Sequence, residues 1–213
     1  MRKIYLPFPI ISSLPLIIFL SVFIAQNAEA ENSIYHNSEH HFSFKIPDGW
    51  MKTPQKFVDH FNKRLEKQAP AAFKNITMVQ LKKSIYWFDY PHFRVGINQK
   101  KTSKEEIKKL IASKEVEEAM DQVASEIERT SILTRNVEIN KPVYDDKRNL
   151  ILTGRSSYVV EAGKVKSLMA IFLGNEVSIS LDFYSLEADY QKYMLDFSEV
   201  INSFKFDPGY DYR

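Results

Sequence analysis

The sequence predicts a three-layer α/β/α sandwich of the α+β class, built around a mostly antiparallel sheet. Residues 150–160, 165–173 and 177–184 have strand composition and are separated by short turns, which is typical of an antiparallel meander. Leu168 to Leu173 is apolar on both faces, so we expect a central strand with material packed above and below it. Amphipathic helices are expected at the start, middle and end of the domain, and a sheet with two buried faces can receive them.

The N-terminal part of the domain is expected to be a hairpin followed by a helix. Residues 34–36 and 42–46 are predicted strands, and the second alternates apolar and polar residues. Trp50 follows a Pro-Asp-Gly turn and is expected to be structural. Thr53 is expected to cap a helix that has Pro54 at its first position and ends near residue 70.

Two strands, a polar helical region and a last helix complete the chain. The strands are expected at 77–88 and 93–98. Ser103 and Glu106 form a capping-box pattern before one helix, or two with a break near Ala112-Ser113. A narrow apolar stripe predicts that this region lies on a core: Ile107, Leu110, Ile111, Val116, Met120, Val123 and Ile127.

The last helix is expected to begin after a Ser185 cap, and the tail from residue 207 to 213 is expected to be loose. One continuous apolar face predicts that this helix packs on the sheet: Tyr190, Tyr193, Met194, Phe197, Val200, Ile201 and Phe204.

The first 30 residues have the pattern of a cleaved secretory signal. Arg2 and Lys3 precede a long apolar run, and Ala28 and Ala30 form the small-x-small pattern of a cleavage site. We therefore expect export to the periplasm or the medium, with one domain over residues 31–206. Mass spectrometry of the exported protein should find Glu31 at its N-terminus, and an intact residue 1 would contradict this prediction.

Composition excludes several classes of function. A net charge of +2 in 213 residues gives no electrostatic case for nucleic acid. The chain has no cysteine, which removes thiol chemistry, cysteine-ligated metals and a lipid anchor on cysteine. After signal cleavage no apolar run is long enough to span a membrane.

Short motifs at the two ends of the domain resemble a known family. The strand Phe42-Ser43-Phe44-Lys45-Ile46 runs into Pro47-Asp48-Gly49-Trp50, and the meander and last helix end in Ser203-Phe204-Lys205-Phe206. Together these features resemble the PsbP-like superfamily, which includes the import factor Mog and bacterial DcrB-type envelope proteins. The resemblance implies an α/β/α sandwich over an antiparallel sheet and a non-enzymatic role in binding or assembly.

His36, His40 and His41 lie within six residues and are the best metal-site candidates. In a hairpin, His40 and His41 would point to opposite faces, so at most two of the three can converge. A closed zinc site needs about four ligands, so a polar hairpin is the preferred interpretation and no metal site is predicted.

No catalytic or cofactor signature stands out either. Gly154 to Tyr158 lacks the closing glycine of a nucleophile elbow and falls inside a predicted strand. His60 and His92 could supply a base to a serine, but nothing selects such a pair. The paired carboxylates are expected on a solvated helix face or in a turn; these are Glu105-Glu106, Glu117-Glu118 and Asp145-Asp146.

The aromatic segment 86–93 is the most plausible working surface. Exposed Trp and Tyr often anchor interfaces, although large aromatics are more often core, and core is the preferred interpretation here. We conclude from the sequence that this is an exported, non-catalytic binding or assembly protein, with no cofactor and with another envelope protein as its partner. The alternatives are an envelope hydrolase with a Ser–His site, or a weak metal-binding protein that uses His36 and His40.

Overall fold

A computed structural model describes residues 34–68, 74–98, 103–131 and 133–211. The predicted signal segment therefore lies outside the described residues. The described chain is of the α+β class, and its strands form two sheets in which every pairing is antiparallel.

The larger sheet has eight strands in the order β3-β4-β5-β10-β9-β8-β6, and β7 pairs with β8. The predicted meander is confirmed, with β9 between β8 and β10 at the centre of the sheet. The strands are β3 (Trp50–Lys52), β4 (Lys74–Leu81), β5 (His92–Asn98), β6 (Thr134–Ile139), β7 (Val143–Asp145), β8 (Leu150–Val159), β9 (Gly163–Leu173) and β10 (Ser178–Leu186).

The smaller sheet corrects the expectation of a single sheet. It consists of β1 (Ile34–Asn37), β2 (Phe42–Lys45) and β11 (Lys205–Phe206), in the order β1-β2-β11. The alternating residues of β2 predict a strand but not its neighbours. The Ser203 hydroxyl at the end of the last helix accepts a hydrogen bond from the Lys45 amide. This contact helps to hold β2 beside the C-terminal segment, where it pairs with β11 and not with the large sheet.

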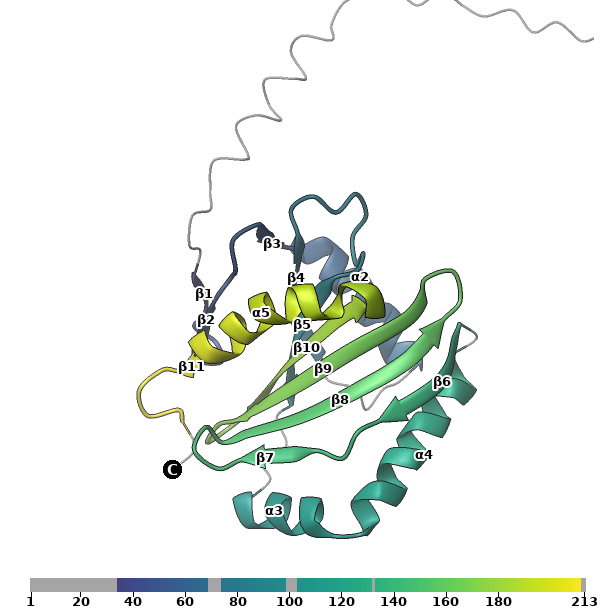
Figure 1. Ribbon diagram of the computed structural model, residues 1–213. Coiled ribbons are helices and arrows are strands. Elements are labelled where there is room, and N and C mark those ends of the chain that lie inside the picture. The colour runs from purple at the N-terminus through teal and green to yellow at the C-terminus, as the bar shows by residue number, and fades with distance from the viewer. Residues whose placement is uncertain (1–33, 69–73, 99–102, 132, 212–213) are drawn as a thin grey trace, which may run out of the picture.

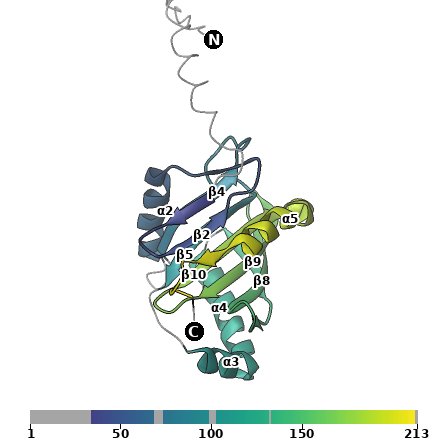
Figure 2. The ribbon, with the colours of Figure 1, turned by 90° about the vertical axis from the view of Figure 1, so that its left-hand side faces the viewer.

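Helices cover both faces of the large sheet. Helix α5 (Glu187–Ser203) lies across one face, as Figure 1 shows. Helix α2 (Gln55–Gln68) lies on the opposite side of the sheet in Figure 2. Helices α3 (Lys104–Ala112) and α4 (Glu115–Thr130) face the same side as α2, because their apolar residues lie opposite the strand positions that point away from α5. The three-layer architecture is therefore confirmed.

The main core lies between the large sheet and α5, with β2 packed at one end. The predicted apolar face of α5 is confirmed: Tyr193, Phe197, Val200 and Ile201 are buried there. Rings dominate this layer, and Phe183 contacts Phe197 with ring centroids 5.0 Å apart. The sheet contributes Phe93, Val95, Ile97, Ala170, Phe172, Ile179, Leu181 and Phe183.

Two predicted helix caps are wrong, and the middle capping box is right. Ser103 accepts the Glu106 amide, and the Glu106 side chain accepts the Ser103 amide. The Thr53 hydroxyl is instead buried with no hydrogen-bond partner in the described residues. Ser185 belongs to strand β10, and its hydroxyl donates to the Leu186 carbonyl, because β10 runs directly into α5.

The predicted strand 77–88 and the loose tail also need correction. Strand β4 ends at Leu81, and residues 82–91 form a loop that contains a cis bond before Pro91. The tail is docked as far as residue 211, because Tyr210 stacks on His41 at a ring distance of 3.7 Å and its carbonyl accepts the Asn175 amide. Strands β6 and β7 have no counterpart in the prediction.

Candidate functional site

An apolar cavity of about 420 Å³ lies between α3–α4 and the face of the large sheet that points away from α5. Met169 and Ile171 of the central strand β9 form part of its floor. The helices contribute the opposite wall, and β8 and β10 extend the floor to both sides. The prediction that β9 is apolar on both faces is right. On this second face, however, its side chains meet a cavity instead of a tightly packed layer.

The helical pair leaves this space because it rests on the margin of the sheet. Helix α4 packs along β6, and α3 contacts β7. Ion pairs hold this arrangement at the periphery: Lys108 to Asp146 at 2.9 Å and Lys141 to Glu117 at 3.2 Å. Two members of the predicted stripe, Ile107 and Val116, are buried, whereas Leu110 and Val123 remain 52% and 46% exposed. The stripe is therefore only partly covered by protein.

One end of the cavity is charged. Arg155 of β8, with Asp182 and Tyr184 of β10, lines it. Strand pairing places Tyr184 opposite Ser167, and Ser167 opposite Arg155, so these side chains share one face. Arg94 of β5 pairs directly with Asp182 and lies behind this wall. Three strands, β5, β10 and β8, thus bring two guanidinium groups and one carboxylate together at the mouth of an apolar space.

The aromatic ring of Tyr184 organises these groups. The guanidinium carbon of Arg94 lies 4.2 Å from the ring centroid, and that of Arg155 lies 5.4 Å from it. His92 stacks on the same ring at 5.3 Å, and Tyr90 stacks on His92 at 5.5 Å. Guanidinium groups favour such contacts with the negative face of a ring, especially where water is excluded.

Burial dominates the electrostatics of this cluster. It raises the pKa of Asp182 against the opposing effect of Arg94 and Arg155. It also lowers the pKa of both arginines, which nevertheless stay protonated because guanidinium is so strong a base. Oδ1 of Asp182 and Nε of Arg94 are sealed from solvent and have no hydrogen-bond partner in the described chain. Such unsatisfied buried polar atoms are uncommon in native proteins.

His92 carries no charge at neutral pH. Burial, and then the positive charge of Arg94, lower its pKa to about 3. Its Nδ1 lies 3.2 Å from the Asp89 carbonyl, an acceptor, so that nitrogen is the donor. The cluster therefore has two cations and one ionisable acid, without a contribution from the imidazole.

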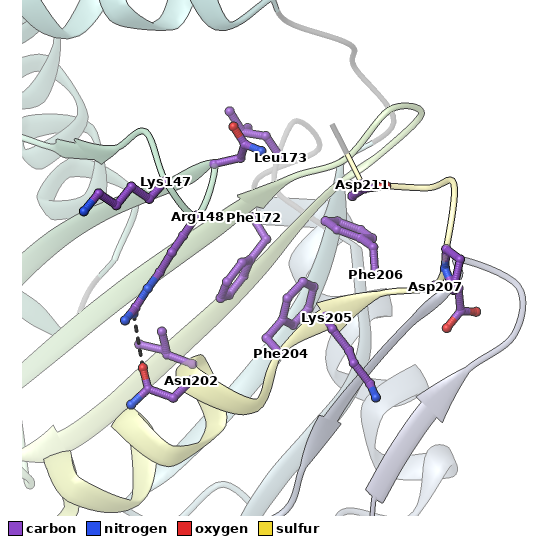
Figure 3. Close-up of a pocket in the computed structure, with 13 residues that line it drawn as sticks. Lys147, Arg148, Phe172, Leu173, Asn202, Phe204, Lys205, Phe206, Asp207 and Asp211 are labelled. Atoms are coloured by element: carbon purple, nitrogen blue, oxygen red, sulfur yellow. Dashed lines mark hydrogen bonds between the residues drawn. The ribbon is translucent and has the colours of Figure 1, made fainter. Parts of the chain in front are cut away.

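A second, more open cavity of about 740 Å³ lies on the α5 side, between the end of β9 and β11. Figure 3 shows its phenylalanine rings beside the side chains of Arg148 and Lys205. Several of its groups already have partners: Phe172 stacks on Phe204 at 3.8 Å, and Arg148 donates to Asn202 at 3.1 Å. This cavity is therefore the weaker candidate for a binding site.

The histidine cluster does not assemble as the metal hypothesis requires. Nε2 of His36 and Nδ1 of His41 lie 3.2 Å and 3.6 Å from Oδ2 of Asp207, whereas His40 lies beside Glu39. The pair that converges is thus His36 with His41, and not His36 with His40. Over residues 34–211, leaving aside the undescribed gaps, no three His, Asp or Glu side chains are grouped to hold a metal ion.

The residues of the hydrolase hypothesis are also apart. His60 is exposed on α2, and His92 is buried with its Nδ1 on a backbone carbonyl. Gly154 to Tyr158 lies inside β8, as predicted. Asp145 accepts amide hydrogens from Lys147 and Arg148, which confirms a turn there.

The aromatic segment 86–93 divides between surface and interior. Tyr86 is 70% exposed. Trp87 stacks on Phe57 of α2 at 4.9 Å, and Phe93 is buried in the main core. Most of the segment is therefore structural, as preferred, and only its first residue is presented to solvent.

Sequence reasoning missed the charged cluster. In the sequence, Asp182 is one of the polar positions that alternate with the apolar residues of β10, and this pattern alone does not single it out. The available signal was a charged residue within each of three strands, β5, β8 and β10: Arg94, Arg155 and Asp182.

The antiparallel meander, the helix that crosses it and the aromatic strand before Trp50 define a PsbP-like fold. The solution structure of the cyanobacterial PsbP protein CyanoP, from Synechocystis, is similar with a TM-score of 0.51 and 12% identity, over 84% of this chain and 95% of that one. LpqN of Mycobacterium tuberculosis, described as involved in cell envelope biogenesis, gives a TM-score of 0.45 and 9% identity, over 89% of this chain and 97% of that one. The CyanoP similarity establishes the fold alone.

No family model matches the sequence, and the comparison with curated proteins also gave no match. None of the helices in the described part of the chain combines the length and apolar character that a membrane span requires.

Proposed function

We propose that this protein is an exported, non-catalytic binding protein of the cell envelope, and that the cavity under α3–α4 holds the aliphatic part of a small ligand. The observation that carries this proposal is the cavity itself: about 420 Å³, with an overwhelmingly apolar lining. Ligand pockets typically occupy about 300–1,000 Å³ and are lined mainly by apolar side chains with a few polar groups.

The packing of the helices supports this function. If the apolar stripe of α3–α4 served only stability, it would pack directly against the sheet, because buried apolar area stabilises the fold by about 25 cal/mol per Å². Here Leu110 and Val123 stay about half exposed although Met169 and Ile171 lie across the cavity from the helical pair. An aliphatic ligand would cover both surfaces at once. The predicted signal segment supports a location outside the cytoplasm.

The test is binding of an uncharged apolar fluorophore, N-phenyl-1-naphthylamine, to the purified protein. We expect saturable binding with enhanced, blue-shifted emission. Met169→Trp fills the cavity from its floor and should weaken binding about tenfold or more. This factor corresponds to the loss of one buried apolar group, which contributes about 1.5–3 kcal/mol to the binding free energy. Leu195→Trp adds the same ring on the exposed side of α5 and should leave binding unchanged.

Thermal melting curves of both variants check that each remains folded. Absence of saturable binding to wild-type protein, or equal binding by Met169→Trp and the wild type, would overturn the ligand proposal. That result would instead favour a protein partner, for which Ile85 and Tyr86 offer an exposed apolar surface.

A further inference from the structure

We infer that the ligand of this cavity is a single-chain carboxylate, a fatty acid, and that Arg155 binds its headgroup. This inference rests on the proposed function and adds the chemical class of the ligand. It is carried by the charged end of the cavity, where a buried cluster contains more positive than negative charge.

The charge balance sets the sign of the headgroup. The two guanidinium groups interact with one carboxylate, Asp182, and His92 is neutral. The cluster therefore keeps an excess of positive charge within a poorly solvated site, whether Asp182 is ionised or protonated. An uncompensated buried charge is costly, and a bound anion offsets that cost. With Asp182 ionised the excess is one positive charge, which matches a monovalent carboxylate better than a phosphate monoester, which carries about −1.5 to −2.

The geometry assigns the contact to Arg155. Its side chain lines the cavity, whereas Arg94 lies behind Tyr184 and is not part of the lining. A planar guanidinium donates two parallel hydrogen bonds to a carboxylate, which is a stronger and more selective contact than a point charge provides. Arg94 is then a positioning residue, because it holds the Tyr184 ring against which Arg155 rests.

The shape of the cavity favours one chain. The volume of about 420 Å³ lies near the small end of the range of about 300–1,000 Å³ for ligand pockets, which leaves no room for a lipid with two long chains. The apolar floor at Met169 and Ile171 adjoins the charged end at Asp182. A molecule that is charged at one end and aliphatic along its length fits both regions together.

The experiment compares three ligands with one chain and different heads: decanoate, decanol and decylamine. Each displaces N-phenyl-1-naphthylamine from wild-type protein at neutral pH. We expect decanoate to bind about tenfold tighter than decanol, since only the carboxylate forms charge-assisted hydrogen bonds with the guanidinium, and decylamine to bind most weakly.

Variants locate the headgroup. Arg155→Gln should weaken decanoate binding about tenfold and leave decanol unchanged, whereas Arg155→Lys, which keeps the charge, should retain part of the preference. Asp182→Asn removes the competing negative charge and should tighten decanoate binding. Arg148→Gln is the matched control, because Arg148 lies outside this cavity and pairs with Asn202 on the other side of the sheet.

The outcomes separate this inference from the proposed function. Equal affinity for decanoate and decanol in the wild type, with the fluorophore still bound, would overturn the fatty-acid assignment and leave an uncharged ligand. Equal loss of both ligands in folded Arg155→Gln would show that Arg155 is structural. Failure of the fluorophore and all three ligands to bind would overturn the proposed function itself.

Discussion

Replacing Trp50 with alanine is expected to lower the free energy of unfolding by about 4 kcal/mol, the cost of removing a large, fully buried aromatic ring. Trp50 is 2% exposed at the join between the hairpin and the large sheet. Its ring lies 5.7 Å from Phe93 and 6.1 Å from Tyr193, and its Nε1 donates to Asp196 at 2.8 Å. One side chain thus ties the start of β3 to the sheet and to α5.

Urea denaturation followed by far-ultraviolet circular dichroism measures this effect, because fluorescence would change with the tryptophan itself. Trp87→Ala is the matched control, since the chain has two tryptophans and Trp87 makes one ring stack at the surface of α2. Its expected cost is about 1 kcal/mol. Trp50→Phe keeps most of the apolar area and should lose about 1–2 kcal/mol through the missing hydrogen bond. Equal losses for Trp50→Ala and Trp87→Ala would contradict the structural role.

Acidification from pH 7 to pH 5 is expected to lower the free energy of unfolding by about 2 kcal/mol through His92 alone. The folded protein holds this pKa at about 3, whereas the unfolded chain titrates near the ordinary value of 6.5. Between these values the unfolded state binds the extra proton, so stability increases with pH across this window and is lost as pH falls through it. The physical cause is burial first, followed by the positive charge of Arg94.

The measurement is a set of urea titrations between pH 7 and pH 5 on the wild type and His92→Gln. The difference between the two pH profiles isolates His92, because every other titrating group is shared. His60→Gln, at an exposed position on α2, is the control and should keep the wild-type pH dependence. Identical profiles for the wild type and His92→Gln would show that His92 has the same pKa in the folded and unfolded states, which would contradict this prediction.

Local sequence patterns predicted the elements that bury one side against the core. The alternation in β10 and the seven-residue apolar face of α5 specify which side of each element is buried, because one period fits each pattern. Strand 77–88 was predicted too long because Tyr86, Trp87 and Phe88 are good strand residues. In the structure Trp87 packs on Phe57 and Phe88 on Phe61 of α2, so tertiary contacts overrode strand propensity.

The candidate site was beyond sequence reasoning for a different reason. Arg94, Arg155 and Asp182 come from three strands, and only their registers place them on one face. A polar residue at an alternating position usually points to water, and the sequence does not reveal that helices and neighbouring strands bury this one. The histidines show the converse: closeness in sequence did not bring His40 to the partner that His36 and His41 share.

By itself the sequence determined the α+β class, the central position of β9 and the capped start of the middle helical region, because each follows from local residue patterns. Only the tertiary structure decided that the hairpin joins a separate sheet with β11, and that α3–α4 stand away from β9. It also decided that two guanidinium groups and a carboxylate meet at the end of the resulting cavity. These features depend on which elements, far apart in the sequence, pack against one another. That packing is decided by the summed contacts and electrostatics of the whole domain.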